Sequence, residues 1–411
     1  MLRMRWGKIA LLGVALVLVL SLLVTACDSD SDKDADDEKR VKVGGLLAFT
    51  GPASATTKPG GEAWLDWFKY VNEQGGIDGV LVDTIWLETA LNYANSLIGH
   101  KKFKDARVLT EFGIGAGIEV IAPLLAKDKV SILNMMGMTD VCWTYPEQWA
   151  FVSSAGYGPE YASLLKWIAD NWTGAGLPKV GMIMVDYAPG WESVKNVEEV
   201  AEEVGVEWAG YEAVPRVGVI DTSTELLRLQ GKGIDWLTVA HYGGSMVVMI
   251  HDIARLLGDS GIEVIDSIHC LDDISIGITG EDSEGWYSLC VTPSKDQTEW
   301  RNMSLVYDLA LEYRGLSEPS TGYVGGVLVG MVMEEAIRVA IDEVGFENLD
   351  GPAVRDAYAS MKAFDTGITP PVTMTDDRPF YTNKGWMSQV QDGKLLRIDD
   401  KYVAPTWYLE R

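Results

Sequence analysis

The chain has 411 residues, of which 60 are acidic and 34 are basic, so its formal charge at pH 7 is -26. Nucleic-acid binding normally needs a basic surface, and this balance therefore argues against nucleic acid as a partner. Hydrophobic residues make up 47% of the chain, which is enough for globular cores. A chain of this length exceeds what one core usually supports, so two lobes are expected.

Residues 1–26 are predicted to be an export signal. Arg3, Arg5 and Lys8 precede an apolar run over residues 9–24, which is short for a membrane-spanning helix. The run ends at Val24-Thr25-Ala26-Cys27 and resembles the signal of bacterial lipoproteins, in which the cysteine is lipidated. We therefore expect Cys27 to anchor the protein to the cell membrane, in the periplasm or on the outer face of the cytoplasmic membrane. The alternatives are a secretory signal with a chance cysteine and an uncleaved signal-anchor.

Residues 27–40 are predicted to form the lipidated cysteine and an acidic linker. After Cys27 the segment contains only Asp, Ser, Lys, Ala, Glu and Arg. Such a segment cannot bury enough apolar surface to offset the entropy of ordering it. It would hold a folded domain close to the membrane surface.

From residue 41 onward, strand and helix patterns alternate. Trp64, Phe68 and Val71 recur with helical spacing, and Gly75-Gly76 ends that helix. Strands are predicted at residues 42–49, 80–87, 131–136, 179–185, 206–214, 234–240, 263–268 and 286–289. Further helices are predicted through Ile121 and Leu125 and from near Trp191, Thr222, Ser245, Asp296, Gly322 and Pro352, and a hairpin at residues 386–398. The segment through His100 and Val108 is only weakly patterned. This alternation predicts an α/β fold with parallel sheets covered on both faces.

The loops after these strands are the expected ligand site, because open parallel sheets bind ligands outside the carboxyl ends of their strands. The rule points to Thr50 and to residues 137–139, 186–191, 241–244 and 272–273. These loops combine glycine, hydroxyl, aromatic and acidic residues, a mixture suited to a small polar ligand with an apolar part. The alternatives are turn chemistry for the glycines and packing against strand ends for the aromatic residues.

Four motifs carry a family resemblance: residues 44–52 (GGLLAFTGP), 72–79 (NEQGGIDG), 122–139 (beginning APLL) and 390–394 (VQDGK). Together they resemble the leucine/isoleucine/valine-binding proteins of branched-chain amino acid ABC importers, which have the type I periplasmic binding protein fold. The resemblance implies two Rossmann-like lobes with parallel central sheets, joined by three crossover segments and closing on a ligand. It places lobe 1 at residues 41–154 plus 293–367 and lobe 2 at residues 155–292 plus 368–411.

The resemblance also implies a set of ligand-binding residues. It further implies a membrane permease and its ATPase as partners. The residues it points to are Thr56, Ala116, Gly137, Met138, Thr139, Tyr187, Trp191, Tyr242 and Asp272. Gly137 and Thr139 match positions that hold the ligand's carboxylate and amine, and Asp272 is the favoured acidic partner for an ammonium group. Ala116 stands where the family has a serine, and this loss removes one hydrogen-bond donor. The expected ligand is thus a branched-chain-like amino acid held differently, or an amide, urea or carboxylate analogue.

Other site chemistry is limited. Cys270 and Cys290 each end a strand-like run, so they either form a disulfide or remain buried thiols, and Cys142 is left over. The sequence has no metal-ligand spacing and no motif typical of a nucleophile, a phosphate-binding loop or a zinc protease. We therefore expect no metal, no cofactor and no enzymatic activity. The alternative to an importer subunit is a ligand-sensing lipoprotein that feeds a signalling partner.

Overall fold

The structure is a computed structural model that describes residues 38–51, 53–115, 117–135, 147–240, 244–267, 271–380 and 384–404. Arg40–Arg411 form one compact unit, distinct from Met1–Lys39. The predicted export signal and Cys27 lie outside the described residues. Among the described residues, no helix combines the length and the apolar character needed to cross a membrane.

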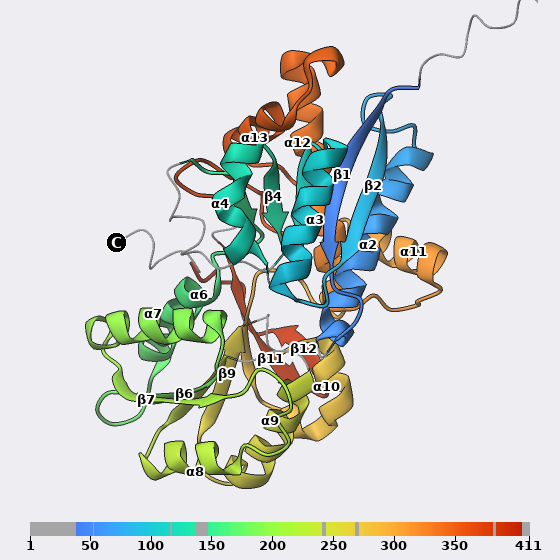
Figure 1. Cartoon of the computed structure of the whole chain (residues 1–411). Coiled ribbons are helices and arrows are strands. Elements are labelled where there is room, and N and C mark those ends of the chain that lie inside the picture. The colour runs from blue at the N-terminus through green and yellow to red at the C-terminus, as the bar shows by residue number, and fades with distance from the viewer. Residues whose placement is uncertain are drawn as a thin grey trace, which may run out of the picture. The chain divides into compact units, whose positions relative to one another are not determined.

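The first sheet has five parallel strands in the order β2-β1-β3-β4-β5. Its strands are β1 (Arg40–Leu47), β2 (Leu81–Glu88), β3 (Thr110–Gly113), β4 (Ser131–Asn134) and β5 (Ala150–Val152). The helices around it are α2 (Ser54–Glu73), α3 (Tyr93–Ala106), α4 (Ile118–Asp128), α11 (Met303–Arg314), α12 (Thr321–Val344), η2 (Phe346–Asn348) and α13 (Gly351–Ser360). Figure 1 shows α12 and α13, from late in the chain, beside these early strands. We call this assembly lobe 1.

The second sheet has seven strands in the order β12-β11-β10-β9-β8-β6-β7. Its strands are β6 (Lys179–Val185), β7 (Glu207–Val214), β8 (Trp236–Ala240), β9 (Glu263–Ser267), β10 (Tyr287–Cys290), β11 (Trp386–Gln391) and β12 (Lys394–Arg397). Its helices are α6 (Tyr157–Asn171), α7 (Ala188–Val204), α8 (Ser223–Gly231), α9 (Gly244–Leu257), α10 (Asp273–Thr279) and η1 (Gly280–Ser283). Five strands are parallel, and β11 and β12 pair antiparallel at one edge. We call this assembly lobe 2.

The core of lobe 1 joins two distant stretches of sequence. The fully buried indole of Trp64 donates from Nε1 to Met333 Sδ on α12, 3.2 Å away. One turn along α2, Trp67 Nε1 donates to Glu334 Oε2 at 3.1 Å. Gly326 of α12 lies so close to α2 that a Cβ there would be 2.2 Å from the Gly60 carbonyl oxygen. The helix pair therefore depends on large aromatic residues on one side and on glycine at the closest approach.

The sheet of lobe 2 is buried on both faces. Met182 and Met184 of β6 pack in one apolar cluster with α6 and α7, and Ile183 between them packs in another with α8 and α9. This alternation follows from the two-residue period of a strand. It confirms the sequence-based prediction of a parallel sheet covered by helices on both sides.

Trp300 lies where the chain crosses between the lobes. It packs against the apolar cores of both lobes, and its ring centroid is 5.5 Å from that of Trp386. Later in the chain, Ile368, Met374 and Phe380 pack in the cores of lobe 1. The lobe limits drawn from the sequence stay predictions.

Most predicted elements are present, but the sequence analysis did not predict β3, β5, α6 or α10. Two further differences are instructive. The weakly patterned segment is helix α3. Helix α11 begins at Met303 rather than near Asp296. The reason is that the side chains of Ser294 and Gln297 hydrogen-bond to the β11-β12 hairpin, at Leu395 O (3.0 Å) and Ser388 Oγ (3.1 Å) respectively.

Candidate functional site

Tyr187 connects the end of β6 to lobe 1. It occupies the N-cap of α7 with extended backbone, and its hydroxyl donates to the hydroxyl of Tyr93, the first residue of α3. The two rings are stacked, with their centroids 6.1 Å apart. Burial is the main cause that raises the pKa of each phenol, and the nearby Glu119 carboxylate raises both further. Both hydroxyls therefore stay protonated near neutral pH, so Tyr187 keeps the proton that it donates to Tyr93.

Arg216 adds a cation to the same place. The backbone N–H of Asp186 donates to Val214 O at 2.7 Å, which brings the ends of β6 and β7 together. Two residues after β7, the Cζ atom of Arg216 lies 4.3 Å from the centroid of the Tyr187 ring. Its Nη2 donates to the carbonyl oxygen of Leu91 in lobe 1, at 3.4 Å. Tyr187 and Arg216 thus form one contact across the lobe boundary.

The glycine-rich loop between β3 and α4 needs unusual backbone angles. Gly115 has φ +76° and Gly117 has φ +130°, and a Cβ at Gly117 would lie 2.3 Å from Ser96 Oγ. The Gly117 N–H donates to Glu119 Oε2 at 2.9 Å, so it is already satisfied within the loop. Ala116, between the two glycines, lies outside the described residues.

Asp272 and Asp273 begin α10 with different partners. Asp272 Oδ1 caps the helix by accepting from Ser275 N at 2.7 Å, and burial raises the pKa of Asp272 to about 6. Asp273 Oδ1 accepts from the backbone N–H of Thr321, at the start of α12 in lobe 1, at 2.8 Å. This is a second direct contact between the lobes.

A buried acid lies behind this loop. Asp266 is the penultimate residue of β9, directly opposite Ser288 on β10, and it is fully buried. Burial raises its pKa well above the usual range, and repulsion from Asp272 raises it further. Neither carboxylate oxygen makes a hydrogen bond of good geometry to the residues that the structure describes, although the Ser288 hydroxyl and the Leu271 backbone N–H lie near enough to lower this pKa in part. A protonated Asp266 is the form that fits such surroundings.

Two other predicted site residues, Thr56 and Trp191, lie within the part of the chain that the structure describes. Thr56 lies in the first turn of α2, half-buried, and its hydroxyl donates to Ala53 O at 3.0 Å. Trp191 is 44% exposed; its ring packs edge-on against Tyr211 at 5.5 Å and its Nε1 donates to Asp186 Oδ1. The ligand roles predicted for Thr56 and Trp191 stay predictions.

Several predicted positions lie outside the described residues: Ala116, Gly137, Met138, Thr139, Tyr242, Cys142 and Cys270. Cys290 is buried, and burial raises the pKa of its thiol to about 12. Its Sγ is 3.4 Å from Ser388 Oγ. The disulfide between Cys270 and Cys290 stays a prediction.

The sequence analysis missed Tyr93, Arg216 and Thr321, whose backbone N–H donates to Asp273. Arg216 follows a strand end, so the rule that located the other loops would have found it if applied to β7. Tyr93 begins a helix that has almost no apolar pattern.

A buried charged cluster fixes two helices of lobe 1 to the sheet. His100 of α3 is 1% exposed; its Nδ1 is 2.8 Å from Glu111 Oε1 on β3, and its Nε2 is 3.2 Å from Asp128 Oδ2 at the end of α4. Lys104 pairs with the other oxygen of Asp128. Burial alone would lower the pKa of His100, but the carboxylates of Glu111 and Asp128 together raise it.

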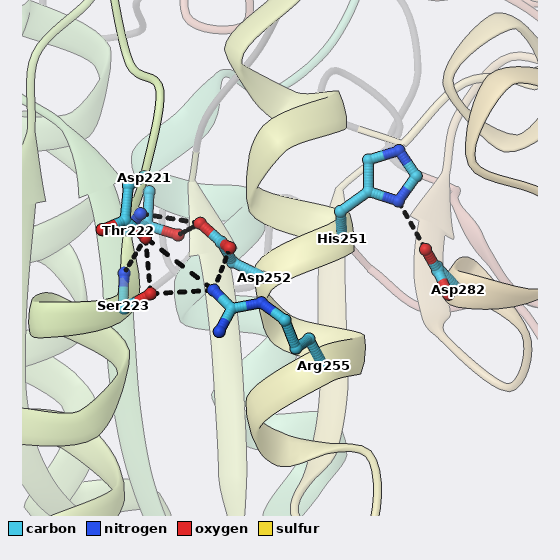
Figure 2. A network of polar contacts seen from close by, with 7 residues as sticks. All are labelled: Asp221, Thr222, Ser223, His251, Asp252, Arg255 and Asp282. Atoms are coloured by element: carbon cyan, nitrogen blue, oxygen red, sulfur yellow. Dashed lines mark hydrogen bonds and ion pairs between the residues drawn. The ribbon is translucent and has the colours of Figure 1, made fainter.

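A second cluster lies in lobe 2, at the start of α8. Figure 2 shows Asp252 of α9 facing Thr222, whose backbone N–H and hydroxyl both donate to Asp252 Oδ2, at 2.7 and 3.0 Å. Arg255 bonds to Asp252 and donates to Ser223 Oγ at 2.8 Å. His251 and Asp282 form a separate, exposed pair beside it. Asp252 therefore holds Thr222, the N-cap residue of α8, from another helix.

The sequence profile described as "Periplasmic binding protein" matches residues 40–394. The chain belongs to the periplasmic binding protein family. Membership implies a location outside the cytoplasm. A search of curated proteins found no match.

Solved structures share the fold of this periplasmic binding protein. A branched chain amino acid ABC transporter protein from Thermus thermophilus with bound valine has a TM-score of 0.82 at 17% identity, over 91% of this chain and 98% of its own. A solute binding protein from Rhodopseudomonas palustris BisB5 in complex with 3,4-dihydroxy benzoic acid has a TM-score of 0.76 at 21% identity, over 89% of this chain and 98% of its own. A fatty acid ABC transporter substrate-binding protein from Thermomonospora curvata has a TM-score of 0.79 at 14% identity, over 90% of this chain and 94% of its own. The predicted two-lobed, type I fold is confirmed.

Proposed function

We propose that this protein is the substrate-binding subunit of an ABC importer, anchored to the membrane by a lipid on Cys27. It captures one small ligand between its lobes by hinge closure and delivers it to a permease that is driven by an ATPase. The observation that carries the proposal is the boundary between the lobes, where the strand ends of lobe 2 meet helix starts of lobe 1 through Tyr187 and Asp273. Closure of this kind buries a ligand by contacts from both sides.

The ligand is proposed to carry a carboxylate. The three structural relatives above are named for valine, a dihydroxybenzoic acid and fatty acid, which share that group. Asp272 would bind the ammonium group of a branched-chain-like amino acid, and Thr139 would contact its carboxylate and amino groups. A simple carboxylic acid would need no acidic partner, and amides or ureas remain the alternative ligand class.

A thermal-unfolding screen of the Arg40–Arg411 unit tests the proposal. The probes are leucine, isoleucine, valine, 3,4-dihydroxybenzoate and octanoate, each beside its amide. A ligand at 100 times its dissociation constant should add about 2.7 kcal/mol to the free energy of unfolding. Stabilisation by amides but not by acids would contradict a carboxylate ligand, and stabilisation by none of these classes would contradict the proposed ligand range.

The Asp272→Asn variant separates the two ligand classes. Asparagine also caps helices well, so α10 should be retained while the charge is lost. We expect an amino acid to bind at least about tenfold more weakly, because its buried ammonium loses its counter-ion, and a simple acid to bind as before. The matched control is Asp350→Asn, which changes the cap of α13 within lobe 1, where Asp350 Oδ1 accepts from Ala353 N at 3.0 Å.

The lipid anchor and the importer role need tests in cells. Cys27→Ser should move the protein from the membrane fraction to the soluble extracytoplasmic fraction and abolish labelling by a fatty acid analogue. Loss of uptake of the identified ligand on deletion of this chain supports an importer; unchanged uptake with a lost transcriptional response supports a sensor.

A further inference from the structure

A group of exposed cations lies at the amino end of the lobe 1 sheet. The group is unusual because the chain as a whole is strongly acidic, with a formal charge of -26 at pH 7. Its members come from the start of β1, the second half of α3 and the end of α4, and we call them the basic patch. They are Lys42, Lys101, Lys102, Lys104, Arg107, Lys127 and Lys129, and all seven are exposed.

Local contacts bring the three segments of the basic patch together. Arg107 is the C-cap of α3, and two residues later the backbone N–H of Leu109 donates to Lys42 O at 2.8 Å. Lys104 of α3 pairs with Asp128, the last residue of α4. Both helices pack in one apolar cluster on the same side of the sheet, as Figure 1 shows. The cations are therefore grouped in space as well as in sequence.

Most cations of the basic patch have no acid beside them. In the part of the chain that the structure describes, Lys104 makes an ion pair and the other six make none. Lys102 Nζ donates instead to the carbonyl oxygen of Trp86 on β2, at 3.2 Å. Asp105 of α3 is exposed and offsets one of these charges. The patch therefore keeps a net positive charge that can attract an external anion.

Exposed apolar side chains lie beside these cations. Trp86, Leu97 and Ile98 are 41%, 39% and 58% exposed. Leu97 and Ile98 each precede a lysine of the patch by one helical turn, so they share the outer face of α3 with it. Basic residues mixed with exposed apolar ones, a tryptophan among them, are typical of surfaces that bind the headgroup region of a membrane.

We propose that the basic patch binds anionic lipid headgroups and holds lobe 1 against the membrane surface. The rest of the chain is acidic and is repelled by the same lipids, so both effects turn this end of the lobe toward the membrane. The chain enters lobe 1 here, at Arg40 of β1, and the lipid anchor proposed above would pull on the same end. The contacts to lobe 2 begin at Tyr93, at the other end of α3, so membrane binding leaves the lobe boundary accessible.

Two other occupants of the patch fit its chemistry less well. A second copy of the chain would bring two basic patches together, and like charges repel. The acidic residues 28–38 are attached close by in sequence and would compete for the cations. They contain no apolar residue larger than alanine, however, so they have nothing to pack against Trp86 and Ile98.

Vesicle co-sedimentation of the Arg40–Arg411 unit tests the proposal with neither a ligand nor a lipid anchor. Vesicles of phosphatidylcholine are compared with vesicles that contain about one quarter phosphatidylglycerol, which is anionic. We expect at least about tenfold tighter binding to the anionic vesicles. Most of that preference should disappear when salt rises from about 0.1 M to about 1 M, because the Debye length falls from about 10 Å to about 3 Å.

Two variants of α3 locate the binding surface. Lys101→Gln/Lys102→Gln removes two exposed charges and should weaken binding to the anionic vesicles by about tenfold. Ile98→Ser leaves the charge unchanged and should weaken binding by about threefold, because an apolar side chain no longer enters the headgroup region.

The matched control is Lys58→Gln/Lys69→Gln on α2. It makes the same change in net charge, on two exposed lysines of the same lobe. Helix α2 covers the opposite face of the sheet, since a Cβ at Gly45 would lie 2.8 Å from Trp64 of α2, whereas one at Gly44 would lie 2.7 Å from Phe103 of α3. The affinity for anionic vesicles should therefore stay within about twofold of the wild type.

Several results would overturn the proposal. They are no preference for anionic vesicles, no loss in either α3 variant, and an equal loss in the α2 control. Binding by Arg40–Arg411 but not by Asp28–Arg411 would overturn it as well, because the acidic residues 28–38 would then occupy the patch. None of these assays measures a ligand or transport, so such a failure is distinct from failure of the proposed importer role.

Discussion

The two lobes fix their helices with polar clusters of opposite character. In lobe 1, His100 and Glu111 are almost fully buried, and one oxygen of Glu111 has no hydrogen-bond partner among the described residues. In lobe 2, Asp252 lies nearer the surface and satisfies the backbone at the start of α8. We expect the first cluster to be most sensitive at its buried members, His100 and Glu111, because removing one leaves the other buried without its partner. The second cluster depends on a single acceptor, the carboxylate of Asp252.

The largest effect is expected for His100→Leu. The substitution leaves Glu111 buried without its partner, so the free energy of unfolding should fall by about 3 kcal/mol or more. Urea denaturation measures the loss. Lys104→Gln, at the exposed end of the same cluster, should cost less than about 1 kcal/mol. If the double variant His100→Leu/Glu111→Leu is no more stable than His100→Leu, the unpaired carboxylate is not the cause.

The same cluster should make stability fall as pH rises. The pKa of His100 is raised by its two carboxylate neighbours, and the pKa of Glu111 is raised chiefly by burial. The folded protein therefore binds more protons than the unfolded chain, whose histidine titrates near 6.5. The histidine's contribution is complete below that pH and is lost as pH rises through its higher folded pKa. Urea midpoints at pH 6 and pH 8.5 should differ more in the wild type than in the double variant.

A smaller effect with the opposite pH dependence is expected for Asp252→Ala. The variant removes the acceptor for both donors of Thr222 and should cost about 1–2 kcal/mol. Burial opposes ionisation of Asp252, but Arg255 and Thr222 lower its pKa overall. Its contribution should thus be present above the unfolded value of 3.8 and be lost as pH falls through the lower folded pKa. Equal stability of variant and wild type at pH 7 would contradict the capping role.

The smallest effect is expected for His251→Gln. The side chains of His251 and Asp282 are 49% and 41% exposed, so water screens their pair. The change in unfolding free energy should stay within about 0.5 kcal/mol by urea denaturation. A loss as large as that of Asp252→Ala would mean that Figure 2 contains one cooperative network and not two independent parts.

The sequence predicted the longer central strands well because their apolar runs are buried on both faces, whereas the short strands β3 and β5 were not predicted. Strand β6 coincides with its prediction, residues 179–185. Helix α3 escaped notice because its buried face consists of Ser96, Gly99, His100 and Phe103, with only one large apolar residue. A Cβ at Gly99 would lie 2.4 Å from Leu46 Cδ2, so a larger residue there would force the Leu46 side chain to shift. Because α3 packs on the sheet through a glycine and a buried ion pair, its sequence lacks the regular spacing of apolar residues from which helices are predicted.

The candidate site was predicted less completely, for a different reason. The rule of strand ends located Tyr187 and the Asp272-Asp273 pair, which lie at the lobe boundary. It could not identify Tyr93 or Thr321 as their partners, because those contacts arise from the juxtaposition of two lobes and leave no local pattern. The same rule pointed to Trp191, whose ring packs edge-on against Tyr211 of β7 and whose ligand role stays a prediction.

The pairing of α2 with α12 has a consequence for biogenesis. Trp64 and Met333 are 269 positions apart, so the first 150 residues lack much of their apolar core until the last third of the chain arrives. Such long-range contacts slow folding, because a large loop must close before they form. The stability of the N-terminal half of lobe 1 is therefore tied to the arrival of the C-terminal third of the chain.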